Sequence, residues 1–149
     1  MAYRYADYPL AGVPVDPRAL GRRAWLPLLT GVFLLLGFGT FLVLPYLVND
    51  LHELSLAELE SGRHDPKDLW PSTGTGGYLF GAAALLLLAL GPLLAVAAAG
   101  WSAVALVARR RVLDIRTRAV LLGAVVVPVA FLVLFFSPFG SSLVAWTMD

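Results

Sequence analysis

One stretch decides how this chain folds, and it is AAALLLLALGPLLAVAAAGWSAVALVA, residues 82–108. No charged side chain interrupts it, and it ends at three consecutive arginines, Arg109, Arg110 and Arg111. An α-helix needs roughly 20 apolar residues to cross the hydrocarbon of a bilayer, and this stretch is longer. The stretch therefore predicts a membrane-spanning helix that stops at a basic segment.

The composition of the whole chain agrees with that prediction. Of the 149 residues, 59% are hydrophobic and 14% are charged, and the mean hydropathy is +0.79. A soluble domain is about half apolar and about a quarter charged. Charged side chains are absent from residues 24–48, 69–108 and 119–148, and each of these runs is long enough to cross a bilayer. Three such runs indicate at least three crossings.

We therefore predict an all-α integral membrane protein that forms a single membrane domain, residues 1–149. The three transmembrane helices are expected at about 24–48, 78–108 and 119–136. They would be joined by a cytoplasmic arm (1–23), an extracytoplasmic loop (49–77), a cytoplasmic basic turn (109–118) and an extracytoplasmic tail (137–149). A helix over 78–108 would be about 46 Å long, so we expect it to tilt or to protrude from the bilayer.

The N-terminal arm carries prolines that oppose a long helix. Asp16 and Pro17 are suited to cap and begin one short turn that ends near Arg22, separate from the first span. Pro27 would then fall in the first turn of the first span, where its missing N–H disrupts nothing. The apolar run that follows exceeds the roughly 7–15 residues of a secretory signal, so we expect no cleavage.

Prolines also mark the later spans. Pro92 and Pro128 lie inside the second and third runs, and each predicts a kink because proline removes one helical hydrogen bond. The sequence SPFGSS, residues 137–142, breaks the apolar pattern after the third span. The residues up to Trp146 then form either an interfacial anchor or the continuation of a single bent helix.

The loop at residues 49–77 is the only sizeable polar segment besides the arm. Ser55 and Glu58 have the spacing of a capping box, in which each side chain bonds to the backbone N–H of the other residue. Gly62 is suited to end the helix that this box begins. We therefore predict a short surface helix at about 56–61.

The distribution of basic residues predicts the orientation. Nine arginines lie in the arm and in the turn at 109–118, whereas the loop at 49–77 holds one arginine and one lysine. Short cytoplasmic segments are enriched in Lys and Arg, so we expect the N-terminus inside, the C-terminus outside, and Arg22, Arg23, Arg109, Arg110 and Arg111 as the topology determinants, near lipid headgroups. The excess of arginine over lysine suggests a bacterial chain, and hence the plasma (inner) membrane.

Few residues suggest chemistry. The chain has no cysteine, and none of the three runs contains Asp, Glu, Lys, Arg or His, which argues against an autonomous proton-coupled transporter. His52 and His64 are weak candidates for a metal site, because nothing in their spacing brings them together. We predict no catalytic residues, no cofactor and no nucleic-acid binding.

Small residues recur on one side of the second span. Gly77, Gly81, Ala95, Ala99 and Ala103 would share a helical face, and Ala98 and Ser102 would widen it. Such faces let helices approach closely in a bilayer. The face is expected either to pack the three spans together or to meet another protein.

The leading hypothesis is a non-catalytic accessory or assembly subunit that packs against a larger membrane complex or against itself. The absence of intramembrane chemistry and the small-residue face motivate it. The alternative is the protomer of a small oligomeric permease or channel, with Pro92 and Pro128 as its hinges. An enzyme or metal-dependent protein that uses the outer loop is the third possibility. The lipid bilayer is a partner in every case.

Overall fold

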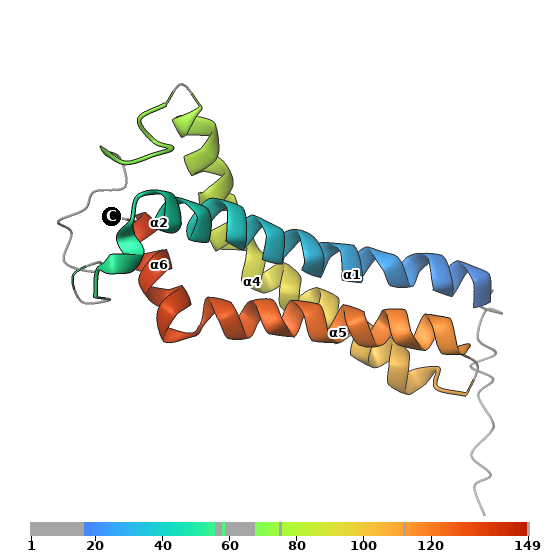
Figure 1. The fold of residues 1–149 in the computed structure, drawn as a ribbon. Helices are drawn as coiled ribbons and strands as arrows, with labels where there is room; N and C mark the ends of the chain where they lie inside the picture. The colour runs from blue at the N-terminus through green and yellow to red at the C-terminus, as the bar shows by residue number, and fades with distance from the viewer. Residues whose placement is uncertain (1–16, 56–57, 59–67, 75, 112, 149) are drawn as a thin grey trace, which may run out of the picture.

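In a computed structural model, the chain forms a long three-helix bundle with one short helix folded back over an end (Figure 1). The structure describes residues 17–55, 58, 68–74, 76–111 and 113–148. The elements, in order, are α1 (Pro17–Phe38), η1 (Gly39–Val43), α2 (Leu44–Val48), η2 (Leu51–Glu53), α4 (Gly77–Ala108), α5 (Ile115–Phe135) and α6 (Pro138–Met148). The described residues include no strand, as an all-α fold requires.

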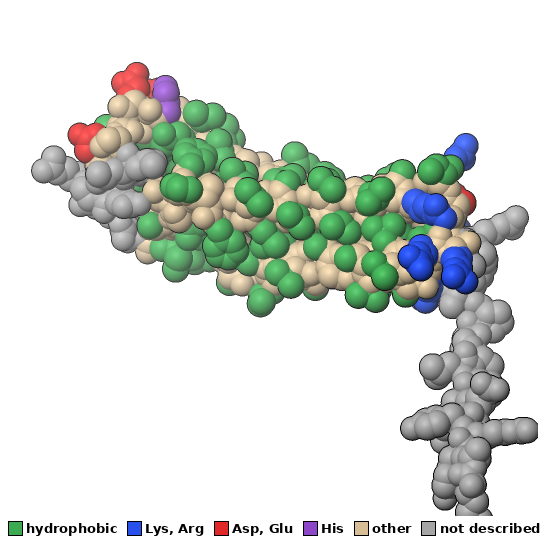
Figure 2. Space-filling model, turned by 90° about the horizontal axis from the view of Figure 1, so that it is seen from below, with side chains coloured by type: hydrophobic (Ala, Val, Ile, Leu, Met, Phe, Trp, Pro, Cys, Tyr) green, Lys and Arg blue, Asp and Glu red, His purple; other side chains and the backbone are tan. Residues whose placement is uncertain are grey.

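Three helical segments are long and apolar enough to cross a bilayer: Gly21–Val48, Gly77–Ala108 and Ile115–Phe135. Large apolar side chains remain exposed along all three, and Leu26, Leu93 and Val133 are examples at 72%, 68% and 67% exposure. Arginines gather at one end of the bundle, together with Asp114, and the other described acidic side chains lie at the opposite end (Figure 2). We call these the basic end and the acidic end.

The first helix begins earlier than the sequence suggested. It starts at Pro17 and stays helical through Val48, so the short turn expected near Arg22 is part of the same helix as the span. The prediction that Pro27 lies in the first turn was wrong, since Pro27 lies well inside α1. Because proline has no N–H, the Arg23 carbonyl loses the donor that a regular helix would provide.

A wider turn interrupts this first helix near the acidic end. Residues Gly39–Val43 form a π-helical turn, in which the Leu44 N–H donates to the Gly39 carbonyl. Pro45 follows directly, and in a regular helix its ring would press on the carbonyl four residues earlier. The wide turn accommodates that ring, and no feature of the sequence predicted this turn.

The third span begins at Ile115 instead of residue 119, because Asp114 caps it. The Asp114 side chain accepts a hydrogen bond from the Thr117 N–H at 3.5 Å. A hydrogen bond with the Thr117 side chain is the largest cause that lowers the pKa of Asp114 below its usual value, and the Thr117 backbone N–H lowers it further. The Arg118 guanidinium donates to the Arg110 carbonyl, which ties the basic turn to the first turn of α5.

The three long helices pack along seams with a spacing of three and four residues. The buried residues that form these seams are Ala24, Pro27, Gly31, Leu34 and Phe38 on α1, Ala84, Leu88, Gly91, Ala95, Ala98, Ser102 and Ala105 on α4, and Thr117, Leu121, Ala124, Pro128 and Phe131 on α5. This average period of 3.5 is that of helices packed side by side at a small angle. Because nearly every residue is apolar, hydrophobic periodicity could not reveal these seams.

A short helix, α6, covers the acidic end of the bundle. The Ser137 hydroxyl accepts from the Gly140 N–H at 3.0 Å and Pro138 occupies the first helical position, so the pair begins the helix. The expected break therefore occurs at residues 136–137, and the chain beyond it is helical from Pro138 onward. Trp146 is 3% exposed and belongs to the core, so it is not an interfacial anchor.

Hydrogen bonds between Asn49 and Trp70 join the two ends of the loop at the acidic end. The Asn49 side-chain amide donates to the Trp70 carbonyl at 2.8 Å and accepts from the Trp70 N–H at 3.2 Å. The predicted capping box is present, with the Ser55 N–H and the Glu58 carboxylate 2.9 Å apart and the Glu58 N–H and the Ser55 hydroxyl 3.3 Å apart. The surface helix predicted at 56–61 lies largely outside the described residues.

Candidate functional site

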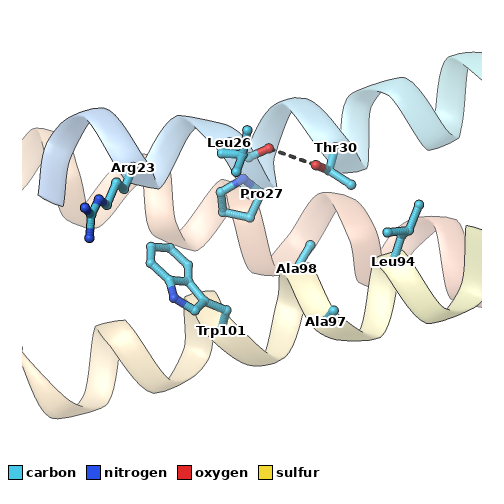
Figure 3. A pocket seen from close by; sticks show the side chains of 8 residues that line it. All are labelled: Arg23, Leu26, Pro27, Thr30, Leu94, Ala97, Ala98 and Trp101. Carbon is cyan, nitrogen blue, oxygen red and sulfur yellow. Dashed lines mark hydrogen bonds between the residues drawn. The ribbon is translucent and has the colours of Figure 1, made fainter. Parts of the chain in front are cut away.

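A groove of about 480 Å³ runs between α1 and α4 on the surface of the bundle, toward the basic end (Figure 3). Its lining comprises Arg23, Leu26, Pro27 and Thr30 from α1 and Leu94, Ala97, Ala98 and Trp101 from α4. Arg23 and Trp101 lie at one end of the groove, whereas Thr30 and Leu94 lie at the other. No motif or spacing in the sequence predicted this groove.

Contacts between the helices bound the groove toward the acidic end. The Leu34 side chain lies 3.6 Å from where a Cβ on Gly91 would stand, and Leu87 lies 3.3 Å from that of Gly37. Toward the basic end, Ala24 and Ala105 belong to one buried cluster with Leu121. The groove therefore occupies a limited stretch of the α1–α4 boundary, between two places where the helices pack.

The interior of the groove is apolar with a polar rim. The Thr30 hydroxyl donates to the Leu26 carbonyl at 3.0 Å, so this hydroxyl is satisfied within its own helix. Trp101 projects from α4 toward α1 and remains 44% exposed. Among the described residues that line the groove, Arg23 alone is charged, and it is exposed. Two features of the sequence could have indicated this groove. Pro27 lies four residues after Arg23, and Trp101 lies toward the basic end of its own span.

The residues expected to form one packing face have different surroundings. Ala95 is fully buried in the core, and Ala99 and Ala103 are half-buried beside it. A Cβ on Gly77 would lie 2.3 Å from the Ser72 carbonyl oxygen, so that glycine serves the local turn. Gly81 has no such neighbour within 4 Å and lines a second groove. The α4 seam thus runs through Ala95, Ala98 and Ser102 and packs within the chain.

The opposite side of α4 carries a second row with the same spacing. Its members are Ala82, Leu86, Ala89, Leu93, Val96, Gly100, Val104 and Val107, and all are exposed. We call this row the exposed face of α4. Three of its members, Ala82, Ala89 and Gly100, are small, and a Cβ on Gly100 would meet no atom within 4 Å. Nothing within the described part of the chain packs on this position.

The second groove, of about 290 Å³, lies at the acidic end. Its walls include Phe41, Trp70, Phe80, Gly81 and Trp146. The Phe41 and Phe80 rings are 4.9 Å apart, and those of Trp70 and Phe80 are 6.1 Å apart. This groove lies where the loop, α4 and α6 meet, and none of the described residues that line it is charged.

The arginines expected to set the topology lie together. Arg22, Arg23, Arg109, Arg110 and Arg111 are at the basic end with Arg116 and Arg118 (Figure 2). His52 is exposed at the acidic end, and its ring centroid lies 6.5 Å from that of Tyr46. His64 lies outside the described residues. Among those that are described, no three His, Cys, Asp or Glu residues are grouped so that they could hold a metal ion.

Comparisons with protein families, with curated proteins and with solved structures find no match to this chain. The function is therefore inferred from the grooves, from the exposed face of α4 and from the distribution of charge.

Proposed function

We propose that the chain is a multi-pass protein of a bacterial plasma membrane, with its N-terminus and basic turn in the cytoplasm and its C-terminus outside. The support is the separation of charge along the bundle axis. Seven arginines with described side chains lie at one end, from Arg22 to Arg118, whereas Asp50, Glu53 and Asp68 lie at the other. Basic residues are retained on the cytoplasmic side of bilayers.

Within that membrane, we propose that the protein is a non-catalytic accessory or assembly subunit that packs against a larger membrane complex or against itself. The observation that carries the proposal is the exposed face of α4. Small residues let helix backbones approach closely, which is the main source of helix association in lipid. Here the row alternates Ala82, Ala89 and Gly100 with larger aliphatic residues, and this pattern suits a partner helix.

Extraction in a lipid-retaining polymer tests this function. A tagged chain is extracted with its surrounding bilayer, and the mass and composition of the assembly are measured. We expect a stoichiometric partner or a defined self-assembly. Replacement of Gly100 and Ala89 by leucine adds bulk to the exposed face and should weaken association about tenfold.

Ala130→Leu is the matched control, because Ala130 is exposed on α5, away from that face. It should leave the assembly unchanged. A chain that remains a lone monomer in its native bilayer would contradict the accessory role. A closed ring of several copies would instead favour the alternative function, the protomer of a small permease or channel.

A further inference from the structure

We propose that the groove between α1 and α4 binds one anionic phospholipid of the leaflet that surrounds the basic end. The phosphate would lie at Arg23, and one acyl chain would lie along the apolar wall formed by Leu26, Pro27, Leu94 and Ala97. This inference adds a ligand to the proposed membrane protein, and it rests on the insertion of the bundle in a bilayer.

The length of the groove identifies an occupant that belongs to one leaflet. From Arg23 to Thr30, and from Leu94 to Trp101, each helix advances seven residues, or about 10 Å along its axis. One leaflet contributes about 15 Å of the hydrocarbon thickness. A partner helix that crosses the membrane would need a groove of about 30 Å, roughly three times as long, whereas part of an acyl chain fits within this one.

The lining of the groove changes from charged to apolar along the bundle axis, in the same order as the parts of a phospholipid. Arg23 supplies a positive charge at the end of the groove that faces the basic turn. Trp101 lies beside it, and tryptophan favours the boundary between headgroups and acyl chains. Beyond these two residues, the lining is aliphatic except for the Thr30 hydroxyl, which already donates to Leu26. A charged head and an apolar tail thus meet matching surroundings.

The backbone near Arg23 offers a second contact for the headgroup. Pro27 provides no N–H for the Arg23 carbonyl, so this oxygen lacks its regular helical donor. A glycerol headgroup carries hydroxyls beside its phosphate, and such a hydroxyl can donate to the carbonyl while the guanidinium holds the phosphate. This combination favours a phosphatidylglycerol over a choline lipid, whose headgroup has no hydroxyl or N–H donor.

Native mass spectrometry of the full chain tests the proposal with dioleoylphosphatidylglycerol and dioleoylphosphatidylcholine as probes. The chain should retain one phosphatidylglycerol about fivefold more strongly than the choline lipid. Arg23→Gln should lower that retention by a similar factor. Arg116→Gln should change it less than about twofold, because Arg116 is exposed at the same end but does not line the groove.

The acyl-chain part of the site has its own variant. Ala97→Phe fills the groove from its exposed wall and should reduce retention of both lipids, and Ala97→Leu should do so to a smaller extent. Ala130→Phe, on the exposed side of α5, is the control and should have no effect. Equal losses from Arg23→Gln and Arg116→Gln would overturn the proposal, since the basic end would then hold headgroups without a defined site. Full retention in Ala97→Phe would also overturn it.

The same spectra report the assembly state separately. If the lipid is not retained while the protein composition of the assembly is unchanged, the result contradicts the lipid site and leaves the accessory role intact. If the partner is lost while the lipid remains bound, the result contradicts the accessory role and leaves the lipid site intact.

Discussion

The half of the bundle near the acidic end packs around aromatic rings, whereas the half near the basic end packs around small residues. Phe38, Phe131 and Trp146 are all at most 3% exposed in the first half, and the Phe38 and Phe131 ring centroids lie 6.2 Å apart. In the second half, Ala24 and Ala98 occupy comparable seam positions. Small residues bring backbones together but fill little space between helices, so the groove opens in the half where none of the described aromatic side chains is buried.

This difference between the two halves predicts where truncating a side chain lowers the free energy of unfolding most. Phe131→Ala removes a fully buried ring at the centre of the aromatic half and should lower the free energy of unfolding by about 3 kcal/mol. Denaturant titration in mixed micelles, followed by circular dichroism, measures the change. Phe136→Ala is the control, because this ring is 69% exposed and its removal should have little effect. Equal losses of unfolding free energy for the two variants would contradict the prediction that buried aromatic rings stabilise this half.

Close approach of backbones makes a different prediction for α1 and α5. A Cβ on Gly31 would lie 2.8 Å from the Cδ atom of Pro128, so Gly31→Ala must push the two helices apart. We expect a loss of about 2 kcal/mol in the same titration. Gly100→Ala is the matched control. Nothing lies within 4 Å of its Cβ, and alanine favours a helix, so it should be neutral or slightly stabilising.

Asn49 joins the end of the first helix to the end of the loop, and its removal should have a smaller, local effect. Asn49→Ala abolishes both hydrogen bonds to the Trp70 backbone, which should cost about 1 kcal/mol. Hydrogen exchange by mass spectrometry should show faster exchange of the Trp70 amide without a change in α5. Slower or unchanged exchange at Trp70 would show that other contacts hold the loop in place.

The sequence predicted the three apolar helices and the capping box because these depend on composition and on local spacing. Ser55 and Glu58, for example, are three residues apart and bond each other regardless of the rest of the fold. The start of α1 was missed because the charges at Arg22 and Arg23 end an apolar run without ending a helix. Helix formation depends on backbone hydrogen bonds, which continue through such residues.

The groove and the seams could not be predicted from the sequence, because they depend on the orientation of each helix about its own axis. In a chain with nearly uniform hydrophobicity, Ala95 and Ala97 look alike, yet one is fully buried and the other lines the groove. The contact between Gly31 and Pro128 depends on the register of two helices that are distant in the sequence. Only the packed structure distinguishes these positions.

The smallest expected effect concerns the cap at the start of α5, near the basic end. Because hydrogen bonding to Thr117 lowers the pKa of Asp114 in the folded chain, the cap stabilises the helix start above the unfolded pKa of about 4. That contribution is lost as the pH falls through the folded pKa, when protonation weakens the acceptor. The Thr117 amide should therefore lose protection from hydrogen exchange at acidic pH, after correction for the intrinsic exchange rate.

Two variants separate the charge of this cap from its hydrogen bond. Asp114→Asn keeps an acceptor for the Thr117 N–H and should show protection that does not change with pH. Asp114→Ala should show low protection at every pH. Since Asp114 is exposed, neither variant should alter exchange in the buried seam around Leu121. If wild-type protection at Thr117 were the same at pH values above and below the pKa of Asp114, the carboxylate would not be the group that begins α5.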